Sequence, residues 1–302
     1  MNAFPQNESQ DEPPDGADPK PGAEISSEIS HPEIPPEISA GTGISLGTDI
    51  SHEVSQLEIP RDPPWNAFDL LRLAILFVVA LIVGIVSAIA AAHYWIYPHA
   101  SFGHLLGVPL VVVAGQALAY VLVLAYMYVM VTREYGRQDF LAAVHWNWPS
   151  SPALYVAIGG TLSIALQVLA SRLPIPKHLP IDSFFRTPAE AWALTIFGVT
   201  LAPLMEEMLF RAFLYPVVAR SIGVMGGIVV TGFCFALLHS SQLANSWGPV
   251  LVIFLVGITI TAVRAYKDSV AAGLIIHIAY NGTISALMFA ATDGFRHLEK
   301  LQ

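Results

Sequence analysis

The chain has 302 residues, of which 54% are hydrophobic and only 12% are charged, and its mean hydropathy is +0.58. Soluble domains carry about 25% charged residues, so this composition excludes an ordinary soluble domain and indicates lipid as the solvent for most of the chain. The net charge of −9 belongs to one end, because residues 1–62 contain 13 acidic and only two basic residues. The rest of the chain is slightly basic, and nothing suggests nucleic-acid binding.

The N-terminal segment differs from the rest in composition. Residues 1–64 are rich in Pro, Glu, Ser and Asp and almost devoid of aromatic residues. Such a segment buries too little apolar surface to offset the entropy lost on ordering. We expect a disordered acidic tail over residues 1–64, a transmembrane helical domain over residues 65–295 and a short C-terminal tail over residues 296–302.

Apolar stretches of about 20 residues recur from Asp69 onward, which is the length that crosses roughly 30 Å of hydrocarbon at 1.5 Å per residue. Only a helix satisfies its own backbone groups in lipid over such a run. The sequence therefore predicts an all-α, multi-pass transmembrane bundle of about seven helices, embedded in the lipid bilayer. The expected spans are 69–92, 105–131, 152–171, 188–214, 222–241, 248–265 and 269–291.

Two helix starts can be read from the sequence. Thr187, Pro188 and Glu190 combine an N-cap residue, a proline at the first helical position and the glutamate of a capping box. Asp268 and Ser269 offer cap residues at the start of the last span.

The basic residues give an orientation. Seven of those near span ends fall on the side that also holds the N-terminus, and five fall on the other. The positive-inside rule then favours a cytoplasmic N-terminus. We expect an integral protein of the bacterial inner membrane.

The fourth span contains ionisable residues, which cost about 2.5–3.5 kcal/mol each in a membrane helix on insertion scales and therefore point to function. Glu206 and Glu207 are adjacent and differ by about 100° in direction around the helix. Glu207 lies four residues before Arg211, the favourable order for a same-face ion pair. This pairing leaves Glu206 facing another part of the bundle, where a kink at Pro203 would help to admit water.

The fifth and seventh spans each carry a histidine with a partner four residues away. Phe235 and His239 share one helix face in the fifth span, and His277 and Asn281 share one face in the seventh. Taken alone, His239 is typical of an interfacial residue at a helix end. The His277 and Asn281 side chains would alone suit interhelical hydrogen bonding.

Together, these side chains suit amide hydrolysis, which needs a base for water and a donor for the developing oxyanion. Glu206 would be the base, His239 would orient the water, and His277 and Asn281 would donate to the oxyanion. Alternatively, Glu206, His239 and His277 form a two-His, one-Glu set that matches a catalytic zinc site with an open position. The sequence does not decide between metal-free and metal-assisted activation of water. A divalent metal such as zinc is the cofactor that the second alternative would need.

Three motifs occur in order, each on its own expected helix: Glu-Glu-x-x-x-Arg at 206–211, Phe-x-x-x-His at 235–239 and His-x-x-x-Asn at 277–281. The chain thereby resembles the CPBP family of intramembrane proteases, which includes type II CAAX prenyl endopeptidases and bacteriocin-processing, Abi-like proteins. The resemblance covers residues 188–291. It implies Glu206 and His239 as the water-activating pair, His277 and Asn281 as oxyanion supports, and Glu207, Arg211 and Phe235 as supporting residues.

The sequence therefore predicts a CAAX-protease-like intramembrane (metallo)endopeptidase that cleaves a membrane-associated polypeptide or peptide. Two rival hypotheses remain. One is a non-catalytic membrane protein of the same fold, such as an immunity protein or scaffold. The other is a proton-coupled transporter that uses Glu206, His239 and His277 as a relay, although the chain lacks the repeated halves and paired broken helices typical of transporters.

Overall fold

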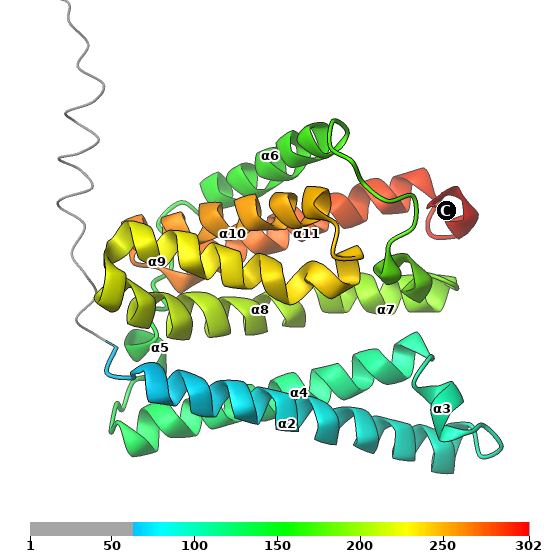
Figure 1. Ribbon diagram of the computed structural model, residues 1–302, viewed down its shortest axis with the longest axis horizontal. Helices are drawn as coiled ribbons and strands as arrows, with labels where there is room; N and C mark the ends of the chain where they lie inside the picture. The colour runs from blue at the N-terminus through cyan, green and yellow to red at the C-terminus, as the bar shows by residue number, and fades with distance from the viewer. Residues whose placement is uncertain (1–62, 302) are drawn as a thin grey trace, which may run out of the picture. The chain divides into compact units, whose positions relative to one another are not determined.

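The computed structural model describes residues 63–301, and every regular element in that part of the chain is a helix (Figure 1). The expected acidic tail at 1–64 falls outside the described residues except for its last two positions, so it stays a prediction. The α-helices are α2 (Ala67–Ala91), α3 (Phe102–Leu105), α4 (Pro109–Val129), α5 (Phe140–Ala143), α6 (Pro152–Ala170), α7 (Pro188–Val199), α8 (Leu201–Glu207), α9 (Tyr215–His239), α10 (Trp247–Lys267) and α11 (Val270–Ala291).

Short segments of other helix types extend or connect these α-helices. Three of them are π-helical: η1 (Ala92–Ile96), η2 (Met130–Glu134) and η4 (Met208–Leu214). The 3-10 segments are η3 (Pro180–Phe184), η5 (Ser240–Leu243) and η6 (Leu298–Leu301).

The helices pack mainly in pairs. The helices α2 and α4 lie side by side as one hairpin, α9 packs on α10, and α6 packs on α11 (Figure 1). The α7–α8 segment bridges these pairs, because it contacts both α4 and α11. This bridging position places α8 between the α2–α4 hairpin and the helices that carry the histidines.

The described residues contain six helical segments that are long and apolar enough to cross a membrane. One of them, residues 188–243, is interrupted at Gly223, whose φ of 81° and ψ of 167° lie outside the helical region. Glu206 and His239 are 33 residues apart, which would be about 50 Å in a straight helix, yet their side chains approach to 3.6 Å. The chain therefore reverses at Gly223 and this segment has two limbs, in agreement with the expectation of about seven spans.

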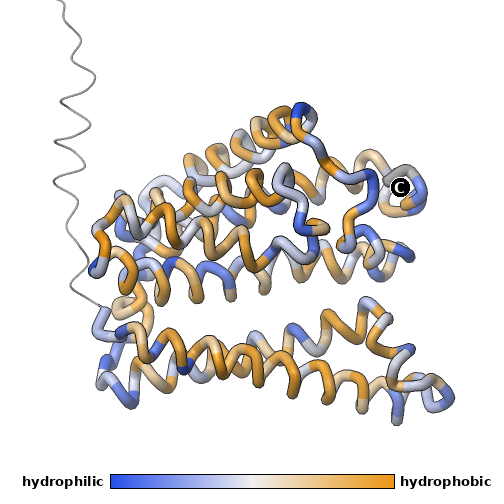
Figure 2. The backbone as a smooth tube through the Cα atoms, viewed as in Figure 1, coloured by the Kyte–Doolittle hydropathy of each residue, from blue (hydrophilic) through white to orange (hydrophobic). Residues whose placement is uncertain are grey.

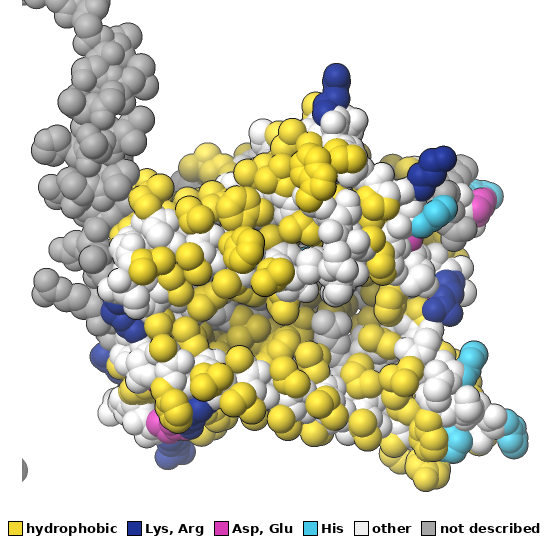
Figure 3. All heavy atoms as spheres, viewed as in Figure 1, with side chains coloured by type: hydrophobic (Ala, Val, Ile, Leu, Met, Phe, Trp, Pro, Cys, Tyr) yellow, Lys and Arg dark blue, Asp and Glu magenta, His cyan; other side chains and the backbone are white. Residues whose placement is uncertain are grey.

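The surface is that of a membrane protein. The middles of the helices are hydrophobic and the ends and connections are more hydrophilic (Figure 2). Large apolar side chains such as Phe68 and Ile82 are more than half exposed, and apolar atoms cover much of the visible face (Figure 3). Contiguous apolar surface of this extent indicates contact with lipid. The chain is a multi-pass integral membrane protein, while the identity of the membrane and the side that holds the N-terminus stay predictions.

Both predicted helix starts are confirmed. The Glu190 N–H donates to Thr187 Oγ1 at 3.3 Å, and the Thr187 N–H donates to Glu190 Oε2 at 2.9 Å, which completes the capping box. At the last helix the Ala272 N–H donates to Ser269 Oγ at 2.9 Å. Ser269 is the N-cap, whereas Asp268 precedes it in a left-handed conformation with φ of 47°.

One predicted helix start and the continuity of one predicted span differ from the structure. The second long helix begins at Pro109, because α3 ends at Leu105 and a separate turn intervenes. The predicted span 188–214 is broken at Thr200, where φ is −119° and ψ is −80°. Pro203 lies in the next turn and has no N–H to donate to the Val199 carbonyl. This missing hydrogen bond is the physical reason for the break.

Candidate active site

The structure brings together three of the side chains selected from the sequence. The Nε2 atom of His239, at the end of α9, lies 3.6 Å from Glu206 Oε1. The Nε2 atom of His277, on α11, lies 3.5 Å from Glu206 Oε2. Each carboxylate oxygen of Glu206 therefore faces one imidazole, and the three groups come from three different helices.

The other nitrogen of each ring is held by an acceptor. His239 Nδ1 lies 2.8 Å from the Phe235 carbonyl oxygen, and His277 Nδ1 lies 2.8 Å from Glu207 Oε1. A carbonyl or carboxylate oxygen only accepts hydrogen bonds, so both Nδ1 atoms carry the proton. In the neutral imidazoles, the Nε2 lone pairs are therefore directed at Glu206.

The distances around Glu206 suit a bridging water molecule. Separations of 3.5 and 3.6 Å are longer than a direct N–H···O hydrogen bond, and polar groups at this range are commonly joined through water. The side chains are 12% exposed for Glu206, 20% for His239 and 4% for His277. The His239 side is thus the more accessible side of the carboxylate.

Glu207 and Arg211 form the ion pair that their spacing predicts. Their side chains are fully buried, and Arg211 Nη1 lies 3.1 Å from Glu207 Oε1. Arg211 also donates from Nε to Thr261 Oγ1 at 3.3 Å and from Nη2 to the Gly257 carbonyl oxygen at 3.1 Å. A buried pair is tolerated only when its remaining donors are satisfied, and α10 supplies those partners.

Glu207 consequently joins two parts of the site. Its Oε1 atom receives both the Arg211 guanidinium and the His277 Nδ1–H. Its Oε2 atom has no hydrogen-bond partner among residues 63–301 and lies against Gly273 of α11, where a Cβ atom would be 2.9 Å away. A side chain at position 273 would displace this carboxylate, which occupies the space that the side chain would need.

Phe235 packs between the charged groups and the imidazoles. Its ring lies 4.8 Å from the His239 ring and 5.7 Å from the His277 ring, centroid to centroid. The Arg211 guanidinium lies 4.7 Å from the centroid of the same ring, within cation–π range. The Phe235 ring therefore contacts both imidazoles and the guanidinium.

Asn281 takes a different position from the other selected residues. Its Nδ2 atom donates to the Gly198 carbonyl oxygen at 2.7 Å. This carbonyl lies near the end of α7, two residues before the break at Thr200. The structure therefore ties Asn281 to α7, and a role at the oxyanion stays a prediction.

The sequence reasoning missed the contribution of α4. Gln116 Nε2 donates to the Tyr120 hydroxyl at 2.8 Å. The Tyr120 ring stacks on Phe197 of α7 at 5.5 Å and shares a buried cluster with Met205, the neighbour of Glu206. The sequence signal for this contact is the spacing of Gln116 and Tyr120, two polar side chains four residues apart within an apolar span.

Within residues 63–301 no group of three or more His, Cys, Asp or Glu side chains is arranged to hold a metal ion. Glu206, His239 and His277 have donor atoms of the kind that zinc prefers, but they do not form such a group.

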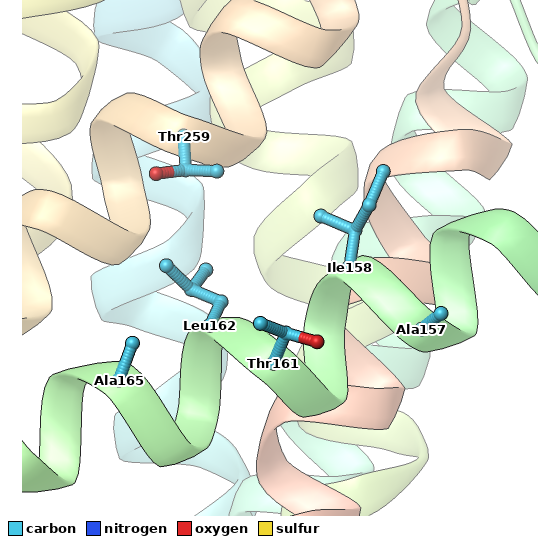
Figure 4. A pocket seen from close by; sticks show the side chains of 6 residues that line it. All are labelled: Ala157, Ile158, Thr161, Leu162, Ala165 and Thr259. Carbon is cyan, nitrogen blue, oxygen red and sulfur yellow. The ribbon is translucent and has the colours of Figure 1, made fainter.

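Two of the grooves on the described structure differ in their lining. One, of about 430 Å³, lies between α6 and α10 and is lined by apolar and small hydroxyl side chains (Figure 4), which carry no ionisable group: Ala157, Ile158, Thr161, Leu162, Ala165 and Thr259. The other, of about 310 Å³, lies between α4, η3, α7 and η5 and includes Gln116, Ser241 and Gln242. The second groove includes residues of η5, the segment that follows His239 in the chain.

Comparison with known proteins assigns the segment that carries the site. No curated protein and no solved structure gives a significant match to the chain. Residues 188–283 match the family model described as type II CAAX prenyl endopeptidase, Rce1-like. The match includes Glu206, Glu207, Arg211, Phe235, His239, His277 and Asn281. Residues 188–283 are thus an Rce1-like segment of the CPBP type, as the motifs predicted.

Proposed function

We propose that this protein is a CAAX-protease-like intramembrane endopeptidase that hydrolyses a peptide bond of a membrane-associated polypeptide with water activated by Glu206. One observation carries the proposal: a single carboxylate between membrane helices has an imidazole Nε2 atom within 3.6 Å on each side. The Rce1-like match of the same segment supports peptide hydrolysis over other uses of this arrangement.

In the proposed reaction, a water molecule lies between Glu206 and His239. Glu206 accepts a proton from the water while the water oxygen forms a bond to the carbonyl carbon of the substrate. The Nε2 atom of His239 accepts a hydrogen bond from the same water. This bond keeps a lone pair of the water oxygen directed at the substrate. When the tetrahedral intermediate breaks down, the carbon–nitrogen bond breaks and Glu206 returns the proton to the leaving amine.

The oxyanion of the intermediate needs donors. We assign this role to Asn281, and to His277 when its ring is protonated. An amide NH2 has two donors, and one of them is used at Gly198. The second N–H of Asn281 would then serve the oxyanion, and losing one such donor costs roughly 10²–10³ in kcat.

Glu207, Arg211 and Phe235 act as positioning residues in this proposal. Glu207 accepts the His277 Nδ1–H, which keeps Nε2 directed at Glu206. Arg211 compensates the buried charge of Glu207. Outer partners of this kind set the tautomer and orientation of functional histidines.

The rival functions differ in what they require of Glu206 and His239. A transporter would use them as a proton relay, and an immunity protein or scaffold would not need them for its effect. Replacing Glu206 or His239 by alanine separates the three cases. We expect uncut membrane polypeptides to accumulate in cells that carry either variant, at normal levels of the folded protein.

Comparative proteomics of membranes from wild-type and Glu206→Ala cells measures this accumulation. A protein whose Glu206→Ala variant loses pH-dependent flux and accumulates no uncut polypeptide would be a transporter. A variant that keeps full protective effect with unchanged membrane polypeptides would be an immunity protein. Either result would refute the proposed function.

A further inference from the structure

The helical turn that follows the glutamate pair is wider than an α-helix. The segment η4, Met208–Leu214, is a π-helix of seven residues, and at its end the Tyr215 N–H donates to the Phe210 carbonyl oxygen, five residues earlier. Turns of this kind are rare and occur frequently at functional sites. Arg211, the ion-pair partner of Glu207, lies within this turn. The geometry of η4 therefore sets where the guanidinium meets the buried carboxylate.

Pro216 weakens the hydrogen-bond ladder where η4 meets α9. It stands at the beginning of α9 and has no N–H, so a carbonyl group one turn before it loses its donor. In a regular α-helix the proline ring would also crowd the carbonyl of Ala212, four residues earlier. A wider turn relieves this crowding. The missing donor makes contacts from outside the helix important for the stability of η4.

Trp65 supplies such a contact from the segment that precedes α2. Its Nε1–H donates to the Phe213 carbonyl oxygen at 3.3 Å, and its ring stacks on the Phe213 ring at a centroid distance of 4.4 Å and an interplanar angle of 15°. Both side chains are at most 1% exposed. The start of α2 lies at the same end of the bundle as the start of α9 (Figure 1), so a residue from far earlier in the chain reaches η4.

Arg220 holds Trp65 in this position. Its guanidinium donates from Nη1 to the Pro63 carbonyl oxygen and from Nη2 to the Trp65 carbonyl oxygen. Phe213 and Arg220 are seven residues apart and lie on opposite sides of Pro216 in the chain. Trp65 therefore bridges the weak point of the ladder, because its side chain binds the residue before the proline and its backbone binds the residue after it.

The contact reaches the candidate site through η4. Arg211 of η4 donates to Glu207 Oε1, which also receives the His277 Nδ1–H. A shift of η4 that moves the Arg211 guanidinium would move this carboxylate oxygen and so the acceptor of the imidazole. Trp65 lies outside residues 188–283, so the Rce1-like match does not include it.

We propose that Trp65 is a positioning residue, which holds η4 across Pro216 and thereby keeps the His277 Nε2 atom directed at Glu206. Its effect on catalysis rests on the proposed function, whereas its effect on the His277 ring does not. Because Trp65 is fully buried, it does not touch a bound polypeptide, and its effect reaches the site only through the helix.

The test uses the full-length protein in lipid vesicles and a quenched-fluorescent peptide that carries a farnesylated cysteine followed by three residues. Trp65→Phe keeps a ring that stacks on Phe213 and removes the N–H, whereas Trp65→Leu removes both. We expect kcat to fall about tenfold in Trp65→Phe, the effect of one lost hydrogen bond, and about 100-fold in Trp65→Leu, where η4 also shifts. KM should stay within about twofold of the wild-type value in both variants, because substrate binding is not touched.

Leu73 provides a matched control for the loss of packing. It lies on α2, is 2% exposed and belongs to the same buried cluster as Trp65 and Phe213. Leu73→Ala should lower Tm at least as much as Trp65→Phe and leave kcat as in the wild type. Equal falls of kcat in these two variants would overturn the inference, because loss of stability would then explain both. An unchanged kcat in Trp65→Leu would overturn it as well.

Nitrogen-15 NMR of histidine-labelled protein separates failure of this inference from failure of the proposed function. The His277 signal is identified by its loss in His277→Gln. In the wild type and in Leu73→Ala this ring should carry its proton on Nδ1, the atom that donates to Glu207. In Trp65→Leu we expect a mixture of the two neutral tautomers, because the acceptor that selects one of them has moved.

The two readouts give distinct outcomes. A tautomer mixture in Trp65→Leu supports the inference even if the wild type cleaves no peptide, a result that would count against the proposed function alone. Cleavage by the wild type together with an unchanged Nδ1–H signal in Trp65→Leu would overturn the inference and leave the proposed function intact.

Discussion

Gly273 lies where the carboxylate of Glu207 meets α11, and replacing it by alanine tests the coupling between this carboxylate and His277. The added Cβ would lie 2.9 Å from Glu207 Oε2 and 3.0 Å from Ile260 Cγ2. Favourable contacts between heavy atoms begin near 3.5 Å, so the carboxylate or α11 must move by about 0.5 Å or more. The Glu207 carboxylate is held on its other side by Arg211, so it cannot simply turn away.

The expected cost has two parts. Overpacking a core costs typically about 1–3 kcal/mol, and replacing glycine by alanine inside a helix returns about 0.5–1 kcal/mol. We therefore expect Gly273→Ala to lower the free energy of unfolding by about 1–2 kcal/mol. A displacement of His277 by a substantial fraction of an ångström should lower kcat by about 10–100-fold.

A matched control lies on the same helix. A Cβ at Gly282 would meet only Val199 Cγ1 at 3.8 Å, an ordinary contact. Peptide cleavage and thermal unfolding of both variants are measured in the same vesicles. Equal kcat values for Gly273→Ala and Gly282→Ala would refute the argument that Glu207 positions His277.

Three further predictions concern the buried charges and the metal question. Arg211→Leu should lower the free energy of unfolding by about 3–5 kcal/mol, because it leaves the Glu207 charge buried without its partner. The double variant Arg211→Leu, Glu207→Gln should recover part of this loss, as measured by thermal unfolding. Burial alone would raise the pKa of Asp268, but the His145 hydrogen bond and the Arg264 charge outweigh it and hold the pKa below its usual value. The stability that this group contributes is present above the unfolded pKa of about 3.9 and is lost as the pH falls through the lower folded pKa, so Asp268→Asn should flatten the acid branch of a stability–pH curve. A wild-type-like slope in that variant would contradict the assignment. Peptide cleavage should survive complete chelation, whereas loss of activity that zinc restores would establish the metal-assisted alternative.

Much of the site could be predicted because membrane helices leave few polar residues to choose from. In the spans that carry Glu206, His239 and His277, each ionisable group has a large cost in lipid, so its presence indicates a function. The i,i+4 rule then gave the Glu207–Arg211 pair directly. The clustering of these residues needed only that three helices pack together.

Other features depend on contacts that the sequence does not display. The carbonyl partner of Asn281 becomes clear only once α7 breaks beside it. The close contact at Gly273 comes from a carboxylate 66 residues earlier in the chain. The predicted spans 188–214 and 222–241 placed a connection between them, but only the structure shows that the chain turns at Gly223, a glycine with positive φ. Tertiary packing decided each of these.

Single-turnover cleavage in water enriched in oxygen-18 tests the activation of water by Glu206 most directly. The reaction is run with excess full-length protein, and mass spectrometry measures the label in the new carboxyl terminus of the peptide and in the Glu206 side chain. Direct attack by activated water predicts one labelled oxygen in the peptide and none in Glu206. Label in Glu206, with an unlabelled peptide after the first turnover, would contradict the account because the carboxylate itself would have attacked the substrate.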